Sequence, residues 1–100
     1  MKFEFEIVKT LRTTNSKGEL CVIGEGDELW LKVDFPSVNL YDHQSYIRQY
    51  PDGWVKGTVR MISDAGDKLY FSRSGVTSNL LVFNLRDVLD VSDKDPREVS

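Results

Sequence analysis

The chain has 100 residues, which is enough for one domain with a single hydrophobic core and too few for two. Hydrophobic residues make up 40% of it and charged residues 29%, a balance typical of a globular protein rather than a disordered one. No apolar run approaches the roughly 18–20 residues that span a bilayer, and the amino end has no hydrophobic signal region, so we expect no membrane contact.

The net charge of −3 is unevenly distributed. Residues 1–44 carry five Lys or Arg against eight Asp or Glu, residues 45–86 carry six against three, and residues 87–100 carry two against five. This mildly basic middle is too weak for a dedicated binder of duplex DNA, which needs a strongly basic face. Because Cys21 is the only cysteine, no internal disulfide can form, and we expect a cytoplasmic protein.

The first 35 residues predict strands. Residues 2–13 alternate apolar and polar side chains, which indicates one half-buried strand, and a turn follows at residues 14–18. Residues 19–23 are apolar on both faces, so this strand should be central or covered. Residues 28–35 are predicted to form the next strand. Its core-facing side chains should be Leu29, Leu31, Val33 and Phe35.

The segment between Pro36 and Pro51 is the exception to this pattern. Asn39 or Asp42 could cap a helix there, and Leu40, Ile47 and Tyr50 would share one face of it, with His43 beside them. A short helical insertion around residues 39–50 is predicted, with irregular coil as the alternative.

Strands are predicted again at residues 54–63, 68–73 and 80–85, and residues 86–91 favour a helical turn followed by a short closing strand. Gly57 marks either a bulge or a close approach of two strands. The side chains expected to face the core are Val55, Val59, Met61, Leu69 and Phe71. Residues 1–91 are thus interpreted as one domain and residues 92–100 as a flexible polar tail.

Short strands with tight turns and one helical insertion predict an all-β fold, a small antiparallel barrel. From Gly26 onward the order of elements resembles that of SH3-like barrels of the Tudor and KOW type: "GDELWLKV", a long loop, "GWVKGTVRMIS", "DKLYFSR", and a last apolar strand ending in "NLRDVLDV". OB-type barrels share much of this order, so SH3-like and OB-like barrels both remain open.

Catalytic groups are sparse. The single histidine, His43, is interpreted as a hydrogen-bonded structural residue, with a catalytic base as the alternative. Cys21 lies within an apolar strand and is interpreted as an inert small hydrophobe. The acidic turn at residues 24–28 lacks the spacing of a calcium loop. We therefore expect no enzymatic activity, no cofactor and no metal.

Aromatic and basic residues interleave on the faces opposite the predicted core. Such a surface suits a protein segment, because Trp, Tyr and Arg are enriched at binding hot spots, and it equally suits single-stranded nucleic acid or a methylated cation. The alternative is that the helix or the amino-terminal strands cover these side chains. The predicted partner-binding residues are Trp30, Trp54 and Tyr70 as anchors, Lys56 and Arg60 as a rim, and Tyr41, Tyr46 and Arg48 from the helical insertion.

The functional hypothesis is a non-enzymatic binding module, an adaptor or an inhibitor of a larger enzyme; by analogy, viral inhibitors of host nucleases are often small acidic domains of this kind. Single-stranded nucleic-acid binding through the same face is the first alternative, and a structural subunit of an assembly is the second. The sequence does not specify the oligomeric state.

Overall fold

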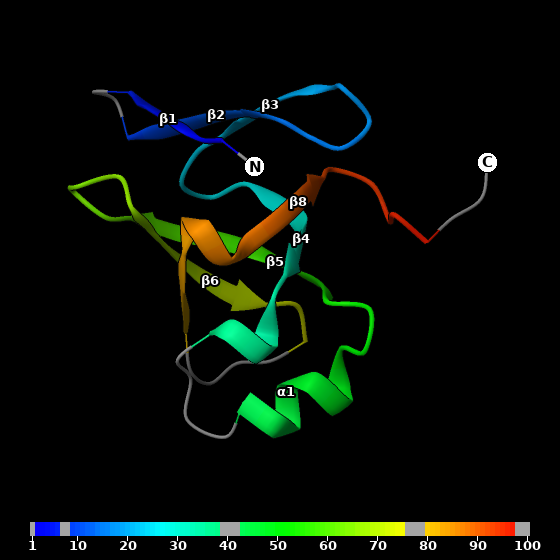
Figure 1. The fold of residues 1–100 in the computed structure, drawn as a ribbon. Coiled ribbons are helices and arrows are strands. Elements are labelled where there is room, and N and C mark those ends of the chain that lie inside the picture. The colour runs from blue at the N-terminus through cyan, green and yellow to red at the C-terminus, as the bar shows by residue number, and fades with distance from the viewer. Residues whose placement is uncertain (1, 7–8, 39–42, 76–79, 98–100) are drawn as a thin grey trace.

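The computed structural model describes the chain except residues 1, 7–8, 39–42, 76–79 and 98–100. The side chains of Glu6 and His43 are also excluded from the description. Two antiparallel sheets dominate it, so the prediction of a mainly β fold is confirmed (Figure 1). The elements are β1 (Glu4–Glu6), β2 (Thr10–Thr14), β3 (Leu20–Ile23), β4 (Glu28–Val33), the 3-10 turn η1 (Phe35–Ser37), α1 (His43–Gln49), β5 (Trp54–Ile62), β6 (Lys68–Arg73), β7 (Leu81–Asn84), the 3-10 turn η2 (Leu85–Asp87) and β8 (Val88–Ser92).

The larger sheet has the order β7-β6-β5-β4-β8 and supplies most of the core. Alternation places one side of each strand inside, and the side chains predicted to face inward from β4 are buried as expected. The core side chains with less than 2% exposure are Leu11, Ile23, Leu31, Phe35, Val55, Val59, Ile62, Leu69, Phe71, Phe83 and Val88.

The prediction for Met61 is wrong, because its side chain is 41% exposed. The pairing of β5 with β6 shifts register between Val59 and Met61, so one extra residue enters β5 and the alternation reverses beyond it. Ile62 consequently takes the inward position that Met61 was expected to fill. Gly57 marks a close approach: a Cβ there would lie 2.7 Å from Phe71 Cε2 and would also collide with the carbonyl oxygen of Ser72.

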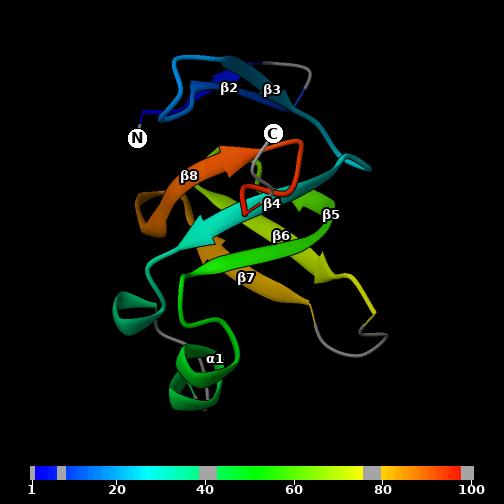
Figure 2. The same cartoon turned by 90° about the vertical axis from the view of Figure 1, so that its right-hand side faces the viewer.

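The smaller sheet has the order β1-β2-β3 and lies across one end of the larger sheet, opposite the end that carries α1 (Figures 1 and 2). Two predictions fail here. Residues 2–13 contribute to two paired strands rather than one, and Lys9, immediately before β2, has a positive φ of 57°. The strand expected to be covered, β3, pairs only with β2 among the described residues, and Leu20 and Val22 are 64% and 53% exposed.

Asn15 joins the smaller sheet to the larger one. Its side-chain oxygen accepts hydrogen bonds from the backbone N–H groups of Lys17 and Glu19, which fixes the turn between β2 and β3. Its amide nitrogen donates to the carbonyl oxygen of Val91 in β8 at 3.2 Å. Next to it, both the backbone N–H and the hydroxyl of Ser16 donate to the carboxylate of Asp90.

A short helix lies within the predicted insertion, over His43–Gln49, and packs beside η1. Tyr46 and Tyr50 stack on Phe35, with ring centroids 5.9 and 5.7 Å apart, and Ile47 also packs against the core. The predicted contact of Leu40 falls outside the described residues. None of the helices in the described part of the chain is long and apolar enough to cross a membrane.

In the described residues, no strand pairing joins β7 to β8, the two edges of the larger sheet. What is established is therefore a mainly β fold with two antiparallel sheets.

Candidate binding face

Strand pairing gathers both tryptophans on the outward surface of β4 and β5. Trp30 lies directly opposite Lys56, and Lys32 lies directly opposite Trp54. Residues directly opposite each other in an antiparallel pair point to the same side, and alternate residues along a strand do so too. All four side chains therefore share one surface, which we call the tryptophan face. Both tryptophans are partly buried, and Lys56 is exposed.

A tight turn sets the position of Trp54. Gly53 has a φ of 81°, and its carbonyl oxygen accepts a hydrogen bond from Val33 N–H at 2.9 Å, which binds the turn to the end of β4. The carboxylate of Asp52 accepts the backbone N–H of Trp54 at 3.1 Å. A side chain at position 53 would be strained, because its Cβ would lie 2.8 Å from the Val33 carbonyl oxygen. Trp54 is therefore held at the first position of β5.

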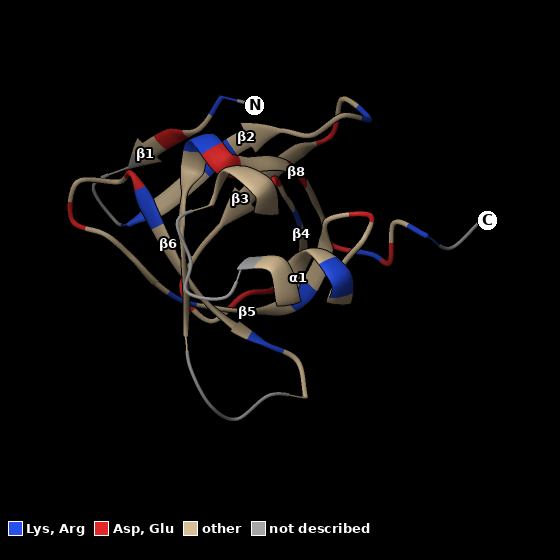
Figure 3. Cartoon of the chain, turned by 60° about the horizontal axis from the view of Figure 1, so that its bottom comes forward, with Lys and Arg blue, Asp and Glu red and all other residues tan. Residues whose placement is uncertain are grey.

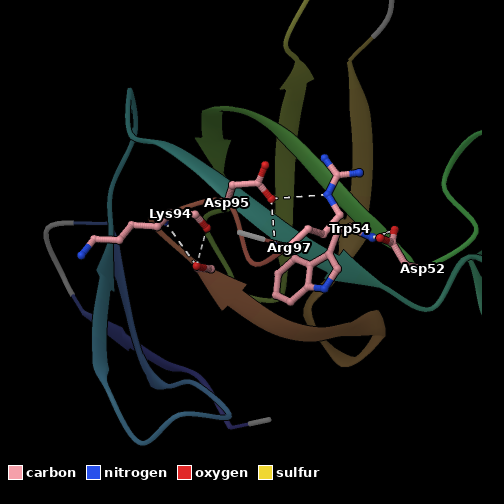
Figure 4. Close-up of polar contacts among 6 residues, drawn as sticks. Asp52, Trp54, Lys94, Asp95 and Arg97 are labelled. Carbon is pink, nitrogen blue, oxygen red and sulfur yellow. Dashed lines mark hydrogen bonds and ion pairs between the residues drawn. The ribbon is translucent and has the colours of Figure 1, made fainter. Parts of the chain in front are cut away.

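Residues 93–97, here called the C-terminal arm, lie against the tryptophan face. The guanidinium carbon of Arg97 lies 4.9 Å from the centroid of the Trp30 ring, which is a cation–π distance. Asp95 accepts hydrogen bonds from Arg97, at 2.9 Å from its backbone N–H and at 3.3 Å from Nε. Figure 4 shows Trp54, Asp95 and Arg97 on the same side of the β4–β5 ribbon.

Between the arm and the face is a hollow of about 340 Å³. Three carboxylates (Glu28, Asp93 and Asp95), Lys56 and Trp30 line it, together with Leu29. Hydrogen bonding by the Arg97 N–H lowers the pKa of the Asp95 carboxyl in spite of partial desolvation, and the charge of Lys56 lowers it further. Lys56 and Asp95 therefore line one hollow, and the charge of Lys56 favours the ionised form of Asp95.

The cations of this region face carboxylates. Lys56 Nζ lies 3.4 Å from the Glu28 carboxylate, and Lys32 lies opposite Asp90 in the pairing of β4 with β8. Acidic and basic residues also interleave along the arm beyond β8 (Figure 3). Desolvation raises the pKa of Asp90, but hydrogen bonds from Ser16 and the Val91 N–H outweigh it and leave the pKa below its usual range. The tryptophan face thus combines two aromatic rings with charges of both signs.

Tyr70 and Arg60 lie apart from the two tryptophans. Tyr70 pairs with Met61, beyond the register shift in β5, so Lys56 and Thr58 separate it from Trp54 along the sheet. Arg60 is exposed at the same far end. These two predicted site residues therefore lie on the same sheet as the tryptophan face but are not part of it.

Of the three residues predicted from the helical insertion, Tyr46 and Arg48 lie in α1 and not on the strands that form the tryptophan face. Tyr46 stacks on Phe35, and the guanidinium carbon of Arg73 lies 5.0 Å above its ring, so Tyr46 belongs to the packing of α1. Arg48 is exposed in the last turn of α1. Tyr41 lies outside the described residues.

Sequence reasoning missed Arg97, Asp95 and Glu28. A basic residue within an acidic terminal segment is usually solvated, and no local pattern distinguishes Arg97 from that case. Its position follows from the pairing of Ser92 with Trp30, which carries the chain directly onto the face.

The described residues contain no group of three or more His, Cys, Asp or Glu side chains arranged to hold a metal ion. A second hollow, of about 270 Å³, lies between the sheets and is partly lined by Cys21. Burial raises the pKa of the Cys21 thiol, and the charge of Asp93 raises it further, so the unreactive protonated form predominates at neutral pH. The side chain of His43 is outside the described part of the structure.

No protein-family model matches the sequence, and neither a curated protein nor a solved structure matches the chain.

Proposed function

We propose that this chain is a non-enzymatic binding module that captures a segment of another protein on the tryptophan face, as an adaptor or as an inhibitor of a larger enzyme. The observation that carries the proposal is the clustering of Trp30, Trp54 and Lys56 on one side of β4 and β5. Large aromatic rings beside a cation supply the contacts that dominate protein interfaces.

The charge arrangement favours a protein ligand over nucleic acid. A nucleic-acid face needs cations that are free to meet phosphates. Lys56 is paired with Glu28, and Lys32 lies opposite Asp90, so a phosphate backbone would meet carboxylates beside each of these lysines. A protein segment carrying both charge signs meets no such penalty.

The strand order is compatible with a small barrel of the SH3-like type. The order β7-β6-β5-β4-β8, with the 3-10 turn η2 immediately before the last strand, fits the SH3-like arrangement that the sequence resembles more closely than an OB-type barrel. Small barrels of this kind serve many functions, so the argument for binding rests on the face and not on the fold.

The test is selection of peptides from a random display library on the wild-type chain, with Trp30→Ala and Trp54→Ala as matched comparisons. We expect enriched peptides that bind wild type and lose at least tenfold in affinity for either variant, with circular dichroism unchanged. Lys68→Ala, an exposed substitution at the start of β6, is the control and should bind normally.

Fluorescent single-stranded DNA and RNA of about 20 nucleotides, titrated at low and high salt, form the second arm of the experiment. Binding that depends on Trp30 and falls steeply with salt would replace the protein-ligand proposal with a nucleic-acid one. Failure to enrich any peptide that distinguishes wild type from Trp30→Ala would also overturn the proposal.

A further inference from the structure

The C-terminal arm provides an example of what the tryptophan face can hold. The arm leaves β8 at Ser92, and a hydroxyl–backbone turn between Ser92 and Lys94 redirects it across β4. Arg97 then lies over Trp30, and Asp95 shares the hollow with Lys56. The arm thus contacts the face through Arg97, and it places a carboxylate in the hollow that Lys56 lines.

Each of these two arm side chains is chemically complementary to the face residue beside it. The Trp30 ring presents a negative π surface, which attracts the planar guanidinium of Arg97. Lys56 lines the same hollow as Asp95, and its positive charge favours the carboxylate form of Asp95. The Asp95–Arg97 hydrogen bonds fix the spacing of the two charges within the arm. A ligand that copies the arm needs a carboxylate two residues before an arginine.

The contact is weakly held by the rest of the chain. The Arg97 side chain is 57% exposed, and Asp95, with which it forms an ion pair, belongs to the arm itself. An exposed ion pair of this kind adds little stability, so the arm can leave the face without unfolding either sheet.

We infer that the C-terminal arm is an internal pseudo-ligand, and that the external ligand of the tryptophan face is a protein segment with the pattern Asp-x-Arg or Glu-x-Arg. The inference rests on the proposed function and specifies its partner. The arm competes with the partner, since a ligand tethered by a few residues acts at millimolar effective concentration. Binding of the partner therefore requires the arm to be displaced.

The direct test adds the arm as a separate molecule. The probe is an end-capped peptide of residues 92–97, titrated into full-length Arg97→Ala protein while the two tryptophan indole N–H resonances are followed by NMR. Assignment uses Trp54→Phe, which removes one of the two signals. Arg60→Ala, which replaces an exposed arginine at the far end of β5, is the control.

We expect Arg97→Ala to shift the Trp30 signal and the added peptide to return it toward the wild-type position. A peptide carrying Arg97→Gln should leave it unmoved, and one carrying Arg97→Lys should bind several-fold more weakly. Apparent affinity scales with the fraction of open face, so an arm docked for about nine-tenths of the time weakens peptide binding to wild type roughly tenfold.

Two results would overturn the inference: no response of Trp30 to Arg97→Ala, or equal responses to the Arg97 and Arg97→Gln peptides. The proposed function is judged separately by the library selection. Selected peptides that require Trp30 but lack an acidic residue two positions before arginine would keep the binding function and refute this ligand class.

Discussion

Two arginines each lie over an aromatic ring, and their surroundings differ. Arg73 lies 5.0 Å above Tyr46, at the end of β6, while Arg97 lies 4.9 Å above Trp30, in the C-terminal arm. The Tyr46 ring stacks on buried Phe35, whereas Trp30 is on the outward face of its sheet. The same contact is thus part of the packing in one place and an exposed contact on the sheet surface in the other.

The anchoring of each guanidinium explains the difference. Arg73 Nη1 lies 3.3 Å from Gln49 Oε1 and 3.4 Å from the Tyr50 hydroxyl, so it joins β6 to α1. Its Nε is buried without a hydrogen-bond partner among the described residues. Such a group is tolerated where the surrounding packing compensates for it. A cation–π distance alone therefore does not separate a structural contact from a binding contact.

The largest expected effect comes from removing the ring beneath the structural contact. Phe35→Ala leaves a cavity beside Tyr46, Tyr50 and Phe83, and should lower the free energy of unfolding by about 3–5 kcal/mol. Urea unfolding followed by circular dichroism measures the change. A loss below about 1 kcal/mol would mean that the cluster does not hold α1 to the sheet.

Removing the structural arginine should cost less. Arg73→Ala loses the contact with Tyr46 and two long hydrogen bonds, so we expect a loss of about 1–2 kcal/mol in urea unfolding. Arg73→Met keeps the packing of the stem and removes the unpaired Nε, and should recover part of that loss. Equal stability of wild type and Arg73→Ala would remove the distinction between the two arginines.

The matched change in the arm should have almost no effect on stability. Arg97→Ala is expected to alter the free energy of unfolding by less than about 0.5 kcal/mol, because the side chain is largely exposed. Tryptophan fluorescence should change nevertheless, since Trp30 loses its cover. A loss as large as that of Arg73→Ala would place the arm in the folded core unit.

The smallest expected effect is the loss of the Asp95 contacts at low pH. The pKa of Asp95 is lowered in the folded chain, first by the Arg97 N–H, so the contacts of its carboxylate are present above its ordinary value of 3.8 and are lost as pH falls below it. The Trp30 indole resonance should therefore titrate with a midpoint below 3.8. In Asp95→Asn this titration should disappear, and its persistence would show that another group controls the arm.

Alternation predicted much of the larger sheet, including the inward residues of β4 and the outward positions of Trp30, Trp54 and Lys56. It failed where the period itself is interrupted, because the extra residue in β5 reverses the faces and exposes Met61. It failed again for β3, since an apolar strand at a sheet edge has the same composition as a buried one. Such errors need knowledge of pairing, which one sequence does not provide.

The residues of the candidate site also fall into those that local sequence spacing predicts and those that depend on long-range pairing. The tryptophan face follows from residue spacing within β4 and β5, which is local information. Tyr46 was misplaced because a tyrosine that stacks in packing has the same sequence pattern as one that binds. Arg97 was missed because its place depends on β8 pairing with a strand far earlier in the chain.

β8 also determines when folding can finish. It pairs with β4 and accepts the Asn15 amide across 76 residues of sequence, so these contacts form only after distant segments have met. Contacts of such long range slow folding, because the intervening loop must close first. During synthesis the nascent chain therefore stays incomplete, with the edge of β4 unpaired, until residue 92 has left the ribosome.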